Sequence, residues 1–176
     1  MTSHLELQDT ASIREFMETF NQTVRTEPTA DVTDKERLLR GALVIEEALE
    51  LLKALGLDFA IGKNAVPQEI TDPKDFALAI NPDVEIDLVE TADAVSDIIV
   101  VTKGTALTFG IPVDNLTIDE VMPSNMSKAG PDKKPIYDPV TNKVLKAEGW
   151  YAPNIPAFLA EYGWKATEST STSTEN

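Results

Sequence analysis

The sequence predicts an all-α fold whose long helices pair into a four-helix bundle. Residues from about 35 to 55 and from about 85 to 109 both keep apolar side chains at helical spacing. The second stretch is apolar nearly all round its helical wheel, which is typical of a buried helix. Such a helix needs helical partners, so we expect the bundle to assemble as a homodimer or a homotetramer.

Capping signals place the helices of the N-terminal half. The first helix is expected within residues 12–24, with Ser12 as its cap. Thr33 or Asp34 caps the longer helix, which runs from about residue 35 to 55 and is closed by Gly56. The first helix has an apolar face that we assign to the core, although its two phenylalanines would also suit a base-binding pocket. This face consists of Ile13, Phe16, Met17, Phe20 and Val24.

Irregular segments separate and follow the two long helices. Residues 57–83 contain three prolines and are expected to form an insertion or lid, with a short helix around 75–80. After the second long helix, the sequence TIDEVM predicts a short helix that begins at Thr117, where Glu120 would complete a capping box.

The C-terminal part is rich in Pro, Gly and Lys and is expected to be short and irregular. The sequence IYDPVTNKVL suggests a hairpin that turns at residues 141–142, and a last small helix is expected at about 155–162. Residues 1–165 are therefore assigned to a single domain, and residues 166–176 to a disordered polar tail.

Composition excludes several classes of function. The absence of cysteine rules out disulfides and thiolate zinc sites, and the single histidine, His4, lies near the terminus. A formal net charge of -15 argues against polymeric nucleic acid as a partner, because binding to its phosphates needs a basic surface. No apolar run approaches membrane-spanning length, and the first residues do not resemble a signal peptide. We therefore expect a cytoplasmic protein, in the host cytoplasm if the gene is carried by a phage.

Two acidic clusters, one on each long helix, are the strongest indication of a functional site in the sequence. Spacing of three or four residues places the members of each cluster on one helical face. Carboxylates crowded in an apolar setting repel one another unless a hard cation lies between them, which favours a site for Mg²⁺ or Mn²⁺. The alternative is a solvated acidic face on each helix. The first cluster is Glu46, Glu47 and Glu50, and the second is Glu90, Asp93 and Asp97.

These motifs resemble those of the all-alpha nucleoside triphosphate pyrophosphohydrolases, which include MazG-like, phosphoribosyl-ATP pyrophosphohydrolase-like and dimeric dUTPase-like proteins. EExxE at 46–50 precedes ExxD at 90–93, and the later SNMSK, NKVLK and Tyr-x-Pro are similar to the phage-borne branch. The resemblance covers about residues 13–159 and looks closest to MazZ-type enzymes, which act on dGTP. It implies a MazG-like bundle that hydrolyses a nucleoside triphosphate, dGTP first among them, to the monophosphate and pyrophosphate with Mg²⁺ or Mn²⁺.

The resemblance also implies roles for individual residues. Glu46 would position or deprotonate the attacking water. For Asp97 four roles stay open: a further metal ligand, an outer-shell partner of the ligands, a contact to the sugar, or a solvated helix residue. The implied metal ligands are Glu47, Glu50, Glu90 and Asp93, and the implied contacts to phosphate or sugar are Asn125, Lys128, Lys143 and Lys146.

Two alternatives to dGTP hydrolysis stay open. The same scaffold would suit a dUTPase-like or phosphoribosyl-ATP pyrophosphohydrolase activity. A protein of another class, a helical binding module that holds cations only for stability, would carry the same carboxylates without turnover.

Overall fold

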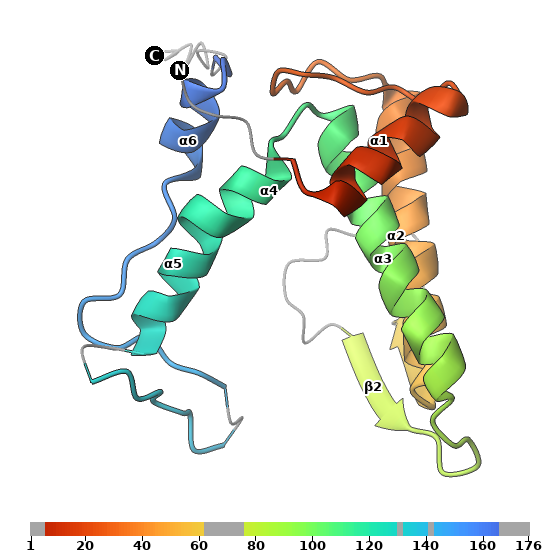
Figure 1. Ribbon diagram of the computed structural model, residues 1–176. Coiled ribbons are helices and arrows are strands. Elements are labelled where there is room, and N and C mark those ends of the chain that lie inside the picture. The colour runs from red at the N-terminus through yellow and green to blue at the C-terminus, as the bar shows by residue number, and fades with distance from the viewer. Residues whose placement is uncertain (1–5, 62–75, 130–131, 141–142, 166–176) are drawn as a thin grey trace, which may run out of the picture. The chain divides into compact units, whose positions relative to one another are not determined.

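The computed structural model describes residues 6–61, 76–129, 132–140 and 143–165, and helices make up more than half of these residues (Figure 1). This confirms the all-α class. The chain divides into two compact units, one formed by residues 32–105 and the other by residues 1–31 with 106–176. The helices are α1 (Gln8–Thr19), α2 (Asp34–Ala54), α3 (Leu88–Thr108), α4 (Val113–Asn115), the π-helix η2 (Leu116–Val121), α5 (Met122–Met126), the 3-10 helix η3 (Ser127–Ala129) and α6 (Ile155–Glu161), and the strands are β1 (Leu57–Ile61) and β2 (Phe76–Ile80).

In the 32–105 unit, α2 has the ends that the sequence predicts. The Thr33 hydroxyl accepts a hydrogen bond from the Glu36 amide at 3.2 Å, and the Glu36 carboxylate accepts one from the Thr33 amide at 2.7 Å. This reciprocal pair is a capping box, and it satisfies amides that the first helical turn leaves without partners. Gly56 closes the helix with a φ of 67°, a conformation that glycine adopts without steric cost.

A β-hairpin follows α2, where the sequence predicts only an insertion with a short helix. β1 and β2 pair antiparallel, in a register that runs from Leu57 opposite Ile80 to Ile61 opposite Phe76. The predicted helix at 75–80 is wrong, because so short a helix gains few internal hydrogen bonds whereas pairing with β1 satisfies the backbone. Residues 62–75 lie outside the described part of the chain.

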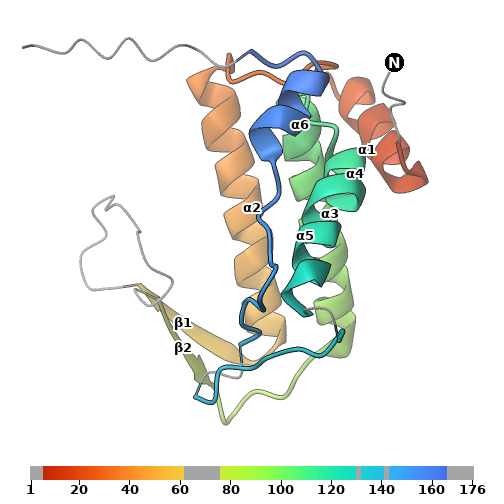
Figure 2. The same ribbon diagram turned by 90° about the vertical axis from the view of Figure 1, so that its left-hand side faces the viewer.

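Main-chain hydrogen bonds join the end of α2 to the segment that leads into α3. The Asn81 amide donates to the Gly56 carbonyl at 2.8 Å, and the Asp87 amide donates to the Ala54 carbonyl at 2.9 Å. Asp87 then caps α3, because its Oδ1 accepts from the amides of Val89 and Glu90 at 3.0 and 3.1 Å. The helix therefore begins near the predicted position and runs back alongside α2 (Figure 2).

Several apolar side chains of α3 are exposed to solvent when only the described residues of one chain are considered, so the helical partner expected from its apolar wheel stays a prediction. Leu88 and Val89 are 76% and 77% exposed, and Val95 and Ile99 are exposed as well. Ala94 is buried in the first half of the helix, and Ala106, Leu107 and Thr108 are buried at its end.

The other unit holds a small core made by α1 and the end of α3. Ile13, Met17 and Leu107 are buried there, and Val24 packs against them, as the sequence predicts for the α1 and Val24 positions. Phe16 and Phe20 do not belong to this core: they are 48% and 63% exposed, and their ring centroids lie 4.7 Å apart. Helical spacing identified an apolar face but not which half of it is covered.

α1 also begins and ends earlier than the sequence predicts. It starts at Gln8, so Ser12 lies inside the helix, and its hydroxyl donates to the Gln8 carbonyl at 3.0 Å instead of capping. Asn21, with a φ of 55°, follows the last turn, and asparagine tolerates this left-handed conformation better than most residues.

A continuous run of helical turns, α4 through η3, occupies residues 113–129 of the same unit. Thr117 lies within this run, so its predicted capping box is wrong: the helix begins earlier, after Pro112. The C-terminal segment is fastened to it, because the Ser124 hydroxyl donates to the Tyr151 carbonyl at 2.8 Å. The main-chain N–H of Asn154 likewise donates to the Glu120 carboxylate at 2.9 Å.

The C-terminal predictions are confirmed where the structure describes the chain. A bridge between Tyr137 and Val144 forms the predicted hairpin pairing, and α6 is the predicted last helix. The proposed turn at 141–142, the tail 166–176 and His4 lie outside the described residues. Within those residues no single helix is long and apolar enough to cross a membrane, and only α3 taken together with the bent helical run after it meets the same criterion.

Candidate functional site

The acidic rows of α2 and α3 face one another in the 32–105 unit. Glu47 is half-buried, and its pKa is raised above the usual value, first by burial and then by neighbouring carboxylates on both helices. Two rows that are far apart in the sequence thus form one region of negative charge. The neighbours that raise the pKa of Glu47 are Asp97, Glu50, Glu46 and Asp93.

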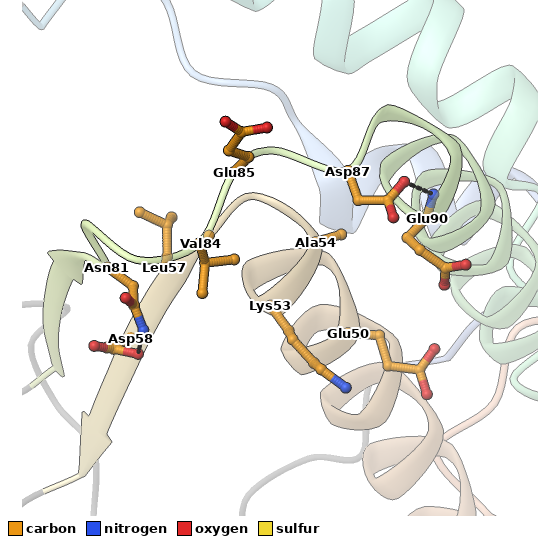
Figure 3. A pocket seen from close by; sticks show the side chains of 11 residues that line it. Glu50, Lys53, Ala54, Leu57, Asp58, Asn81, Val84, Glu85, Asp87 and Glu90 are labelled. Atoms are coloured by element: carbon orange, nitrogen blue, oxygen red, sulfur yellow. Dashed lines mark hydrogen bonds between the residues drawn. The ribbon is translucent and has the colours of Figure 1, made fainter.

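A pocket of about 570 Å³ opens where α2, the hairpin and α3 meet. Glu50 from α2 and Glu90 from α3 both line it, and Figure 3 shows their side chains on the same side of the pocket. This volume lies within the range of small-molecule sites. The other lining residues are Lys53, Ala54, Gly56, Leu57, Asp58, Asn81, Val84, Glu85 and Asp87.

The hairpin side of the pocket is held by polar contacts. The Asn81 side-chain amide donates to Asp58 Oδ1 at 3.2 Å (Figure 3), and Asn81 Oδ1 accepts from the Asp83 amide at 3.0 Å. Asp87, as the cap of α3, orients the first turn that carries Glu90. The pocket walls are therefore tied to the same helix ends that carry the candidate ligands.

The donor set suits a hard divalent cation. Carboxylate oxygens are the ligands that Mg²⁺ and Mn²⁺ prefer, and the mutual repulsion felt by Glu47 is of the kind that a cation would relieve. Glu46, Glu50, Glu90 and Asp93 are exposed and can reorient. Among the described residues, however, no three acidic, histidine or cysteine side chains converge closely enough to form a ready-made site.

The candidate substrate contacts lie in the other unit. Lys128 Nζ donates to Asn125 Oδ1 at 2.8 Å, so the two residues singled out in SNMSK do meet. Lys146 Nζ lies 3.6 Å from the centroid of the Trp150 ring, a cation–π contact, and Lys143 is exposed. That these four residues reach the carboxylates of α2 and α3 stays a prediction.

Comparison with known proteins gives the family. The sequence model for phosphoribosyl-ATP pyrophosphohydrolase matches residues 13–125, well over half of the chain. The chain belongs to the phosphoribosyl-ATP pyrophosphohydrolase family. A search of curated proteins found no match. The part shared with this family includes both acidic rows, and the membership points to a nucleotide pyrophosphohydrolase.

The structure adds pocket residues to those that the sequence suggested for this family member. Asp58 and Asn81 were missed because the hairpin that brings them together was not expected. Asp87 was missed because the helix was started near residue 85, although Asp three residues before Glu90 is a recognisable capping signal. Lys53 follows Glu50 by three residues, so helical spacing alone would have placed it beside that carboxylate.

Proposed function

We propose that this chain is a metal-dependent nucleotide pyrophosphohydrolase that converts a deoxynucleoside triphosphate to the monophosphate and pyrophosphate. The observation that supports the proposal most is the junction of the two acidic rows with the pocket, within the span matched to the family. Glu50 and Glu90 belong both to the rows and to the pocket lining.

In this proposal the carboxylates of the two rows hold Mg²⁺ or Mn²⁺. Glu47, Glu50, Glu90 and Asp93 are the ligands, and Asp97, half-buried beside Glu47, supports them or contacts the sugar. The bound metal would neutralise phosphate oxygens and lower the pKa of the attacking water. The family membership and the oxygen-rich donor set support this assignment.

Glu46 is proposed as the general base that accepts the proton of the attacking water. It lies one turn before Glu50 on α2 and is exposed, so it can approach a water molecule near the ligands. Attack falls on the α phosphorus, and the bond to the β phosphate breaks. Asn125, Lys128, Lys143 and Lys146 are proposed to bind the phosphates or sugar.

We take dGTP as the first substrate to test, because the SNMSK and NKVLK motifs resemble those of the phage MazZ-type enzymes. Phosphoribosyl-ATP is the second candidate, since that substrate gives the matched family its description. A dUTPase-like activity is a third. All three share a phosphoanhydride bond, so the acidic rows serve each of them equally and the base has to be identified by experiment.

Assembly as a homodimer or homotetramer is part of the proposal. Leu38, Ile45 and Leu49 form an exposed apolar stripe on α2, at successive spacings of seven and four residues. The exposed side chains of Leu88, Val95 and Ile99 repeat the same spacing on α3. Stripes at this spacing are the ones that helices bury against other helices in bundles, and a second copy of the chain would present matching stripes.

The test is pyrophosphate release from dGTP, dATP, dCTP, dTTP, dUTP, GTP and phosphoribosyl-ATP, each with Mg²⁺, with Mn²⁺ and with a chelator. We expect release that needs metal and favours one nucleotide. Glu50→Ala should abolish it, whereas Glu15→Ala, an exposed carboxylate on α1, should not.

Two results would overturn the proposal. Pyrophosphate release that persists in chelator, or in the Glu50→Ala variant, would refute the assignment of these carboxylates as ligands of a required metal. No release from any of the seven compounds, with Mn²⁺ still bound, would instead favour a metal-stabilised helical binding module.

A further inference from the structure

Among the described residues that line the pocket, Lys53 is the only cation, and five carboxylates line the pocket with it. Its side chain is exposed, and it forms no ion pair with any carboxylate in the described part of the chain. The described lining is therefore acidic except at Lys53, whose positive charge is not paired with a carboxylate of the described residues. The five carboxylates are Glu50, Asp58, Glu85, Asp87 and Glu90.

Lys53 also has a defined place relative to the proposed general base. Glu46, Glu50 and Lys53 occupy positions i, i+4 and i+7 of α2, so they lie on one helical face. At 1.5 Å per residue, Glu46 lies about 6 Å before Glu50 along the helix axis and Lys53 about 4.5 Å beyond it. Base, candidate ligand and cation thus stand in a row.

That row matches the order of groups in an in-line displacement, where the attacking and leaving oxygens lie on opposite sides of the phosphorus. The attacking water lies at the Glu46 end in the proposed function. With the phosphorus opposite the middle of the row, the leaving oxygen lies at the Lys53 end. Building on the proposed function, we propose that Lys53 binds the pyrophosphate group as it leaves.

The proposed step balances without a further reactant. The water oxygen forms a bond to the α phosphorus, and a proton of that water passes to the Glu46 carboxylate. The bond between the α phosphorus and the oxygen that bridges to the β phosphate breaks, and its electron pair leaves with pyrophosphate. Lys53 offsets the charge that develops on that group, which the carboxylates of the described pocket lining would repel. An ammonium group on a flexible stem suits this task, because it follows the phosphate as it departs.

The experiment compares pyrophosphate binding by the wild type, Lys53→Gln, Lys53→Arg and Lys35→Gln. Lys35 is a matched control, since it is an exposed lysine on the same helix, far from the pocket. Binding of pyrophosphate is measured by titration calorimetry in Mg²⁺, and inhibition of turnover by pyrophosphate and by the nucleoside monophosphate is measured in parallel.

We expect Lys53→Gln to weaken pyrophosphate binding about tenfold or more, the loss that accompanies removal of a charged hydrogen-bond donor. Inhibition by the monophosphate should stay within about twofold, Lys53→Arg should restore most of the pyrophosphate binding, and Lys35→Gln should behave as the wild type. Pyrophosphate binding unchanged in Lys53→Gln, or weakened equally in Lys35→Gln, would overturn the assignment. Weaker binding of the monophosphate alone would also overturn it, because it would place Lys53 at the other end of the substrate.

The calorimetric readout separates this inference from the proposed function. If the wild type hydrolyses none of the nucleotides, the proposed function fails. A loss of pyrophosphate binding confined to Lys53→Gln would still identify Lys53 as the pyrophosphate-binding residue.

Discussion

Replacing Gly56 by alanine should loosen the pocket, both through backbone strain and through a steric overlap with the Val84 carbonyl oxygen. Gly56 has a φ of 67°, and a Cβ built there would lie 2.9 Å from the Val84 carbonyl oxygen, closer than real Cβ atoms come to a backbone atom. The left-handed conformation costs an alanine roughly 1–2 kcal/mol, and relieving the overlap by moving backbone should cost roughly 1–3 kcal/mol more. Gly149 isolates the first effect, because it has a φ of 87° and nothing within 4 Å of its Cβ position.

Hydrogen exchange measures this prediction locally. The Asn81 and Asp87 amides donate to the carbonyls of Gly56 and Ala54, so Gly56→Ala should speed their exchange. An excess cost of about 2 kcal/mol over Gly149→Ala corresponds to roughly a 30-fold rise in the opening equilibrium. Gly149→Ala should leave both amides unchanged. Equal protection of the Asn81 and Asp87 amides in the two variants would refute the reasoning.

Three further predictions concern the site and the assembly. Glu46→Gln should keep metal and nucleotide binding while single-turnover hydrolysis slows about 10²–10⁴-fold, and undiminished turnover would exclude it as the base. Glu47→Gln should stabilise the metal-free protein at neutral pH. Because the folded-state pKa of Glu47 is raised, the cost of its carboxylate is complete above that pKa, and the advantage of the variant in denaturant titrations should vanish as the pH falls below the ordinary pKa of a glutamate. An advantage independent of pH would contradict this cause. Leu38→Glu, at a 75% exposed position of the α2 stripe, should convert the oligomer to monomers in sedimentation velocity. Val140→Glu, 90% exposed and outside both stripes, should leave the assembly intact, and identical sedimentation of the two variants would argue against these stripes as the interface.

The features that the sequence predicted correctly depend on short spacings. The Thr33 capping box, the closure of α2 at Gly56 and the acidic faces of α2 and α3 each follow from residues within a few positions of one another. Local geometry fixes such features whatever the rest of the chain does.

The features that the sequence missed depend on partners that are distant along the chain. β1 and β2 pair across residues 62–75, and neither strand is long enough to show a clear alternation by itself. Phe16 and Phe20 lie on the same apolar face as Ile13 and Met17, so spacing could not tell that only the latter pair is buried. Asp58 and Asn81 became candidates only once the hairpin placed them at one pocket.

The hydrogen bond between the Gly56 carbonyl and the Asn81 amide joins the two ends of the intervening segment. A segment held at both ends in this way can change in length and sequence while Glu50 and Glu90 keep their positions. The entropic cost of closing such a segment into a loop grows only slowly, by about 0.6 kcal/mol for each doubling of its length. We therefore expect that grafting different sequences between these two anchors changes the hairpin side of the pocket while the proposed metal ligands Glu50 and Glu90 keep their places.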